Sequence, residues 1–81
     1  MPRYFFDVND DDSFFRDEYG AELPDLEAAE LEARRSLGEM ARDVLRRPSA
    51  PNSLSIGIRD DAGHQLMEVS VTYAVSSYAA V

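Results

Sequence analysis

The chain has 81 residues, no cysteine, and a formal net charge of −8 that arises from 16 acidic and 8 basic side chains. This composition excludes a disulfide framework and a zinc–thiolate centre, and so acidic a chain disfavours binding to the phosphate backbone of nucleic acids. Apolar residues make up 44% of the sequence, which is too many for a wholly disordered chain.

We therefore expect one small domain over residues 1–81. No apolar run approaches the roughly 18 residues of a membrane span, and the N-terminus lacks the apolar stretch of a signal peptide. The expected location is the cytoplasm, with no membrane partner and no nucleic-acid partner.

The first third of the chain predicts a β-hairpin. Residues 3–8 are aromatic and apolar on both faces, which favours a strand. Residues 9–13 consist of Asn, three Asp and Ser, all of which favour turns, and residues 14–18 supply the second strand. Gly20 then breaks the chain, because glycine adopts a positive φ readily.

The central segment predicts one long helix over about residues 25–47. Asp25 is a favourable N-cap, and Pro48 and Pro51 end the helix and form a linker. Apolar side chains recur at helical spacing and define the face that packs on the core. They are Leu26, Ala29, Ala33, Leu37, Met40 and Val44.

The last third predicts a second hairpin. Apolar and polar residues alternate over residues 53–59 and 65–75, and the segment Asp60–Gly63 forms the turn between them. Residues 76–81 are interpreted as a tail.

These elements predict an α+β fold of order β-β-α-β-β, with a four-stranded antiparallel sheet and the long helix packed on one face. We favour the strand order 2-1-3-4, which makes every neighbour antiparallel and places the aromatic first strand centrally; the order 1-2-4-3 meets the same rule. Alternation along the strands divides the two faces. The face toward the helix is expected to hold Tyr4, Phe6, Ile56, Ile58, Val69 and Val71, and the opposite face Phe5, Ser55, Gly57, Ser70, Thr72 and Ala74.

The acidic turn over residues 7–18 has oxygen ligands at the spacing of a calcium-binding EF-hand loop. Positions 1, 3, 5, 7 and 12 of that loop correspond to Asp7, Asn9, Asp11, Ser13 and Glu18. Position 6, where the bend needs glycine, holds Asp12, and the flanking segments are strands rather than helices. The alternatives are a hydrated hairpin loop and a weak cation site. The metal hypothesis names Asp7, Asn9, Asp11 and Glu18 as ligands, with Asp10 and Asp12 as further oxygen donors.

The residue types that catalysis needs are mostly missing. His64 is the one histidine and lies beside Asp60 and Asp61 in the second turn, without a further ligand or nucleophile nearby. We therefore predict no enzymatic activity and no cofactor. Basic side chains gather in the C-terminal half of the helix, where they complement the helix dipole and are expected to form two i,i+4 pairs, Glu30–Arg34 and Asp43–Arg47. They are Arg34, Arg35, Arg42, Arg46 and Arg47.

A second apolar stripe on the helix suggests a contact surface. Leu31, Gly38 and Leu45 repeat every seven residues, and a glycine inside a helix costs about 1 kcal/mol relative to alanine while permitting close approach. The stripe is either a wide core face covered by the linker or tail, or a surface for a second chain. The outer face of the sheet, with Phe5 and Phe15, is a second candidate, which either stays hydrated or docks on a partner.

Three segments carry a family resemblance: the opening M-P-R-Y-F-F-D-V, the motif F-x-R-D-E-x-G and the segment L-P-D-L-E-A-A. They resemble a domain-of-unknown-function family of short proteobacterial proteins, often encoded in several copies by rhizobium-like soil bacteria. The resemblance runs from Met1 to about Tyr73 and implies no catalytic residue. The chain departs from it in the acidic turn, where family members often have His and Gly. The segment Gly20–Leu26 also has a fainter similarity to the HicB-type antitoxin domain.

Three functional hypotheses follow. The first is a small acidic interaction module that binds a protein partner and associates with itself, as in a homodimer. The second is a weak cation or small-ligand sensor that uses the acidic turn 7–18. The third is a HicB-like regulatory domain.

Overall fold

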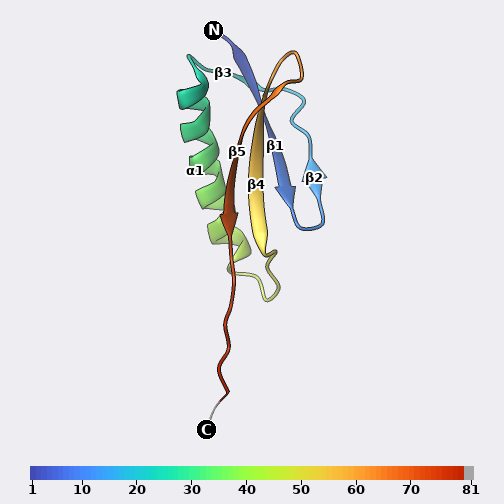
Figure 1. The fold of residues 1–81 in the computed structure, drawn as a ribbon, viewed down its shortest axis with the longest axis vertical. Coiled ribbons are helices and arrows are strands. Elements are labelled where there is room, and N and C mark those ends of the chain that lie inside the picture. The colour runs from blue at the N-terminus through green and yellow to red at the C-terminus, as the bar shows by residue number, and fades with distance from the viewer. Residues whose placement is uncertain (80–81) are drawn as a thin grey trace.

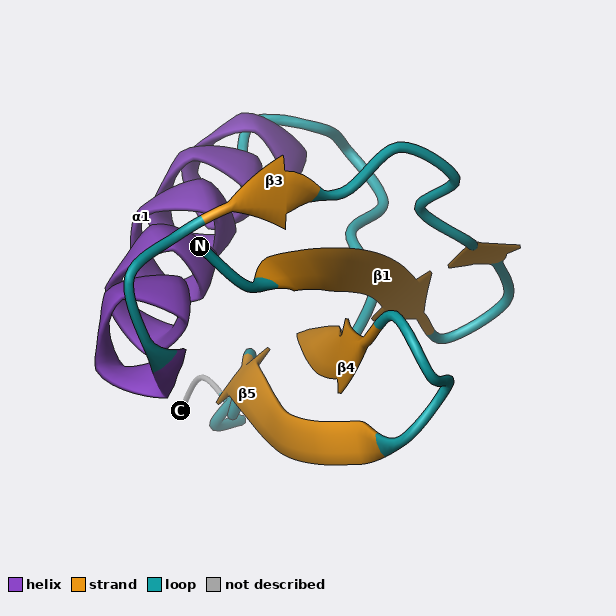
Figure 2. Ribbon diagram, turned by 90° about the horizontal axis from the view of Figure 1, so that it is seen from above, coloured by secondary structure: helices purple, strands orange, loops and turns teal. Residues whose placement is uncertain are grey.

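The computed structural model describes residues 1–79, in which one long helix lies against an antiparallel sheet (Figure 1). Viewed from above, α1 lies along one side of the strands (Figure 2). The α+β fold class is confirmed. The elements, in chain order, are β1 (Arg3–Asp10), β2 (Phe14–Phe15), β3 (Ala21–Glu22), α1 (Leu26–Val44), β4 (Ser53–Asp60) and β5 (Gln65–Thr72).

The sheet has the strand order β2-β1-β4-β5. The predicted order 2-1-3-4 is confirmed, since β4 and β5 are its third and fourth strands, and the order 1-2-4-3 is wrong. The short strand β3 is an addition: it pairs with β1 through Arg3 opposite Glu22 and Tyr4 opposite Ala21. Two residues are too few for the alternation that reveals a strand in a sequence. The second strand ends at Phe15 rather than near residue 18, because the chain then loops around Asp17.

Helix α1 begins and ends on recognisable signals. The side chain of Asp25 accepts a hydrogen bond from the backbone N–H of Ala28 at 2.8 Å, so the predicted N-cap is confirmed. The helix ends at Val44, about three residues earlier than expected, and residues 45–47 form a turn. Of the two expected i,i+4 pairs, Glu30–Arg34 is present at 4.0 Å, whereas Asp43 pairs with Arg42 at 3.8 Å instead of Arg47.

The hydrophobic core lies between α1 and the central strands. Ile56 and Ile58 of β4 are its largest fully buried side chains, as their alternation predicts. Val71 lies on the helix side of β5 but stays 40% exposed, so the core does not reach the outer edge of the sheet. The buried core residues are Tyr4, Ala29, Ala33, Leu37, Leu54, Ile56 and Ile58.

The last strand stops sooner than its alternating pattern suggests. β5 ends at Thr72, where β4 begins, and residues 73–79 continue in the direction of β5 beyond the sheet (Figure 1). Within the described residues β5 pairs only with β4, so its other edge is free. No helix within residues 1–79 has the length and apolarity required to span a membrane.

Candidate functional site

A buried ion pair lies on the sheet face opposite α1. Asp7 of β1 and Arg59 of β4 project from this face, and Nε of Arg59 donates to Oδ2 of Asp7 at 2.8 Å. Both side chains are almost fully buried, at 8% and 11% exposure. Oδ1 of Asp7 accepts from the backbone N–H of Asp17, and Arg59 also donates to the carbonyl of Asp17 at 2.6 Å. The charges are therefore paired and hydrogen-bonded, which burial requires.

Asp17 connects the loop after β2 to the edge of β1. Its carboxylate accepts hydrogen bonds from the backbone N–H groups of Phe6, Tyr19 and Gly20 at 3.0–3.1 Å. The carboxylate thereby provides a hydrogen-bond partner for the N–H of Phe6, at the edge of β1 between the parts that pair with β2 and β3. Burial acts to raise the pKa of Asp17, but the donors from Gly20, Tyr19 and Phe6, together with the charge of Arg59, outweigh it and lower the pKa below the usual 3.8.

Phe5 and Gly20 complete this outer-face network. The guanidinium of Arg59 lies 4.5 Å from the centroid of the Phe5 ring, a cation–π contact. Gly20 has a φ of 70°, and a β-carbon there would lie 2.9 Å from the carbonyl of Tyr4 and 3.0 Å from the Phe5 ring. Glycine is therefore needed at this position both for its backbone angle and for space.

The structure separates the proposed cation ligands. Asp7 is bound to Arg59 and the backbone of Asp17, whereas Asp11 accepts from the N–H of Asn52 at 2.6 Å and from Oγ of Ser53 at 3.2 Å. The EF-hand register of Asp7, Asn9, Asp11 and Glu18 is therefore not assembled as one cluster. Across residues 1–79, no group of three or more His, Cys, Asp or Glu side chains is arranged to hold a metal ion. Of the further donors, Asp10 caps the turn through the N–H groups of Asp12 and Ser13.

His64 is an exposed turn residue. Its ring Nδ1 lies 3.2 Å from Oδ2 of Asp60, and the backbone N–H groups of His64 and Ala62 donate to Oδ1 of Asp60. The hydrogen bond from the His64 backbone, with the His64 side chain, lowers the pKa of Asp60. The cluster stabilises the β4–β5 turn, and the His64 side chain is 76% exposed.

An apolar groove runs between α1 and the free edge of β5. It consists of two adjoining hollows of about 240 and 310 Å³ that share Ala41 and Val71. We call it the α1–β5 groove. Its main lining residues are Gly38, Ala41, Leu45, Val69, Val71 and Tyr73.

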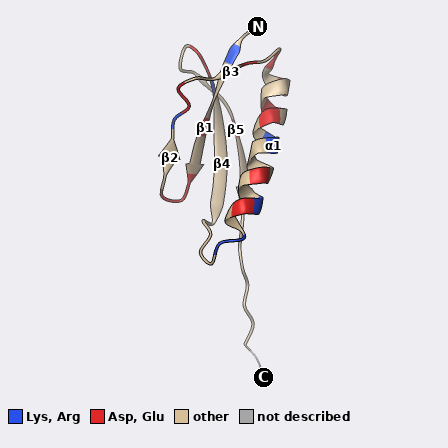
Figure 3. Cartoon of the chain, turned by 180° about the vertical axis from the view of Figure 1, so that it is seen from behind, with Lys and Arg blue, Asp and Glu red and all other residues tan. Residues whose placement is uncertain are grey.

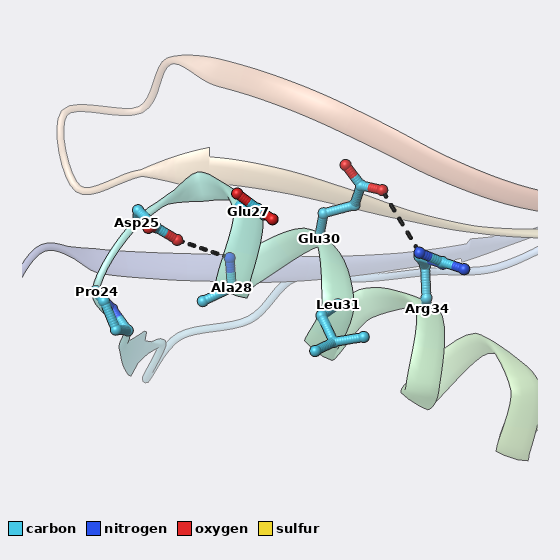
Figure 4. Close-up of a pocket in the computed structure, with 7 residues that line it drawn as sticks. All are labelled: Pro24, Asp25, Glu27, Ala28, Glu30, Leu31 and Arg34. Atoms are coloured by element: carbon cyan, nitrogen blue, oxygen red, sulfur yellow. Dashed lines mark hydrogen bonds and ion pairs between the residues drawn. The ribbon is translucent and has the colours of Figure 1, made fainter.

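The structure brings together two of the five predicted interface residues. Gly38 and Leu45 both line the α1–β5 groove, and a β-carbon added to Gly38 would meet nothing within 4 Å. Leu31 lies instead outside the groove, in a hollow near the start of α1 that it lines together with Glu30 and Arg34 (Figure 4). The prediction that Phe15 lies on the outer face is wrong, because Phe15 pairs with Val8 and therefore lies on the helix side, exposed beside Met40 in a separate hollow. Phe5 does lie on the outer face, under Arg59.

Tyr73 and Val75 were not among the predicted interface residues. The sequence signal for them is the absence of charge: no charged side chain occurs from Val69 to Ala79, although the chain as a whole carries −8. Acidic and basic residues occur along α1 and acidic residues in the turn between β1 and β2, whereas the segment that follows β5 carries no charge (Figure 3). Val75 and Tyr78 are 72% and 88% exposed.

The chain matches a known protein family. The family model described as "Domain of unknown function (DUF6894)" matches residues 3–72, which include all six elements of the fold. No curated protein and no solved structure matches the chain.

Proposed function

The chain belongs to the DUF6894 family, a family of domains of unknown function, and we propose that it acts as a small non-catalytic interaction module that associates with itself. The α1–β5 groove is the proposed contact surface. In this proposal the protein works in the cytoplasm, and its self-associated form presents further surface to a protein partner.

The observation that carries the proposal is the apolar surface left uncovered along α1 and β5. Leu45, Val71 and Tyr73 line one groove and are 50%, 40% and 39% exposed. Contiguous apolar side chains beside an unpaired strand edge favour association, because burying them releases hydrating water and satisfies the backbone groups of the edge. A chain of 81 residues also gains stability from such burial, since its own core is small.

The buried polar groups support a non-catalytic role. Asp7, Asp17 and Arg59 satisfy one another and the backbone of β1, so their donors and acceptors are used in holding the sheet and its loop together. Within residues 1–79, no buried side-chain nitrogen or oxygen lacks a hydrogen-bond partner. A catalytic group needs a donor or acceptor free to meet substrate.

Size-exclusion chromatography with light scattering tests the proposal. The wild-type chain is expected to pass from monomer toward dimer between micromolar and millimolar concentration. Leu45→Asp is expected to weaken association by about tenfold or more, because the carboxylate enters the apolar groove. Leu31→Asp is the matched control, since Leu31 of α1 is about as exposed as Leu45 but lies outside the groove. A wild-type chain that stays monomeric throughout would defeat the proposal.

A further inference from the structure

We propose that the free edge of β5 pairs with the C-terminal segment of a second copy of this chain. The segment, residues 73–79, adds to the partner's β5 as an antiparallel strand, and the exchange is reciprocal about a two-fold axis at Thr72. This inference rests on the proposed self-association and identifies which segment of the second copy fills the α1–β5 groove.

The edge of β5 lacks the usual protection against pairing. Exposed sheet edges are normally blunted by charged residues, proline or a covering segment. β5 has a bulge near its start, beside Arg59, and a single charged side chain, Glu68; its remaining edge is open. Two copies that each carry −8 repel one another over most of their surfaces. The uncharged stretch from Val69 to Ala79 is where they approach with least repulsion.

In residues 73–79, every second residue directs its backbone N–H and C=O to the same side as the open edge of β5. The N–H of Tyr73 donates to the carbonyl of Asn52 at 2.7 Å, so the backbone groups of Tyr73 point toward β4. Successive residues of a strand direct these groups to opposite edges. Ser70 and Thr72 therefore direct theirs to the open edge, and in the same extended course Ala74 and Ser76 do so too.

The direction of the backbone groups limits the register. The two-fold axis must lie at a residue that directs its N–H and C=O to the open edge, and Thr72, the last residue of β5, is such a residue. Placing Thr72 opposite Thr72 of the second copy pairs Gln65–Val71 with residues 73–79, which continue in the line of β5 and have no β4 residues opposite them beyond Tyr73 (Figure 1).

In this register the side chains match the groove. Side chains alternate between the two faces, so Tyr73 and Val75 share the helix side with Val69 and Val71. Val71 then lies opposite Tyr73 of the second copy, and Val69 opposite Val75. These apolar side chains enter the groove over Gly38, where there is space within 4 Å of the absent β-carbon. On the outer face Glu68 lies opposite Ser76, so like charges do not meet.

A matched pair of proline variants of the full chain tests the ladder by sedimentation equilibrium. Ser76→Pro removes an N–H that the ladder uses, and is expected to weaken the dimer by about tenfold or more. Ser77→Pro removes an N–H that points to the opposite side, and is expected to change the affinity by less than about threefold. Both residues are exposed beyond the sheet, so thermal unfolding of the monomer checks that the fold is unchanged.

Disulfide trapping locates the axis, because the chain has no cysteine of its own. Thr72→Cys is expected to form a covalent dimer under mild oxidation, and Ser76→Cys is not. Two results overturn the ladder and leave the proposed function intact, provided that the wild-type chain dimerises. In the first, Ser76→Pro and Ser77→Pro change the dimer affinity equally. In the second, Ser76→Cys forms the covalent dimer more readily than Thr72→Cys. A wild-type chain that is monomeric at all concentrations, including one whose C-terminal segment folds back on its own β5, overturns both.

Discussion

The carboxylate of Asp7 accepts a 2.8 Å hydrogen bond from Nε of Arg59, and this buried pair joins β1 to β4 on the sheet face opposite α1. Asp17 and Gly20 hold the loop after β2 against this face of the sheet. The backbone of Asp17 is hydrogen-bonded to Asp7 and Arg59, and Gly20 packs closely on Phe5. Asp7 of the opening strand and Asp17 and Gly20 of the F-x-R-D-E-x-G motif thus stabilise the fold. The apolar edge of β5, on the helix side of the sheet, is the surface that we propose for association.

Removing one partner of the buried pair is expected to be costly. Asp7→Asn leaves the Arg59 charge buried without its counter-ion, so the free energy of unfolding should fall by roughly 3 kcal/mol. Urea unfolding followed by circular dichroism measures the change. Asp12→Asn, in the exposed part of the same hairpin, should alter stability by less than about 0.5 kcal/mol. Equal effects of the two substitutions would contradict a structural role for the pair.

The pKa of Asp17 predicts a pH dependence of stability. Because its folded-state pKa lies below 3.8, the ionised form is stabilised by folding. This contribution to the free energy of unfolding is fully present above the unfolded-state pKa of about 3.9. It is lost as the pH falls through the folded-state pKa. The difference in unfolding free energy between wild type and Asp17→Asn should therefore be constant near pH 7 and shrink below pH ~4. A difference that grows on acidification would exclude this cause.

Two glycines should respond to alanine in opposite directions. Gly20→Ala forces a positive φ on alanine and places its β-carbon 2.9 Å from the carbonyl of Tyr4, so unfolding free energy should fall by more than about 1 kcal/mol. Gly38→Ala meets nothing within 4 Å and should raise it by about 0.5–1 kcal/mol. Thermal unfolding at a concentration where the chain is monomeric gives both values. A gain for Gly20→Ala would show that the loop is not held as described.

Salt should strengthen self-association. The contact surface is uncharged from Val69 to Ala79, while the two copies each carry −8. Raising ionic strength from about 0.01 to 0.1 M shortens the Debye length from roughly 30 to 10 Å and weakens the long-range repulsion. Sedimentation equilibrium at the two salt concentrations should give a lower dissociation constant at the higher one. Weaker association in salt would indicate ion pairs across the contact.

Much of the fold is predictable from the sequence because local signals agree. Asp25, the helical spacing of Ala29, Ala33 and Leu37, and the alternation around Ile56 each predict the element that forms, and the antiparallel rule selects the strand order. The short strand β3 and the early end of β5 are not predictable in this way. Both depend on which segment lies beside them: β3 on β1, and β5 on the length of β4.

The candidate site was harder to predict, because its residues depend on pairing at long range. Nothing local distinguishes Asp7, which binds a residue 52 positions away, from the hydrated acids of the neighbouring turn. The seven-residue spacing of Leu31, Gly38 and Leu45 predicts one stripe, yet only the last two of these residues lie beside β5. The uncharged run from Val69 onward was visible in the sequence, and it becomes informative once β5 is known to be an edge strand.

Amide hydrogen exchange measured residue by residue at several protein concentrations tests the central claim most directly. The N–H groups of Ser70 and Thr72 should exchange rapidly in dilute solution and become protected as the concentration rises. Those of Val69 and Val71, which point toward β4, should be protected throughout. Ser70 and Thr72 amides that remain unprotected at millimolar concentration would contradict pairing at the edge of β5.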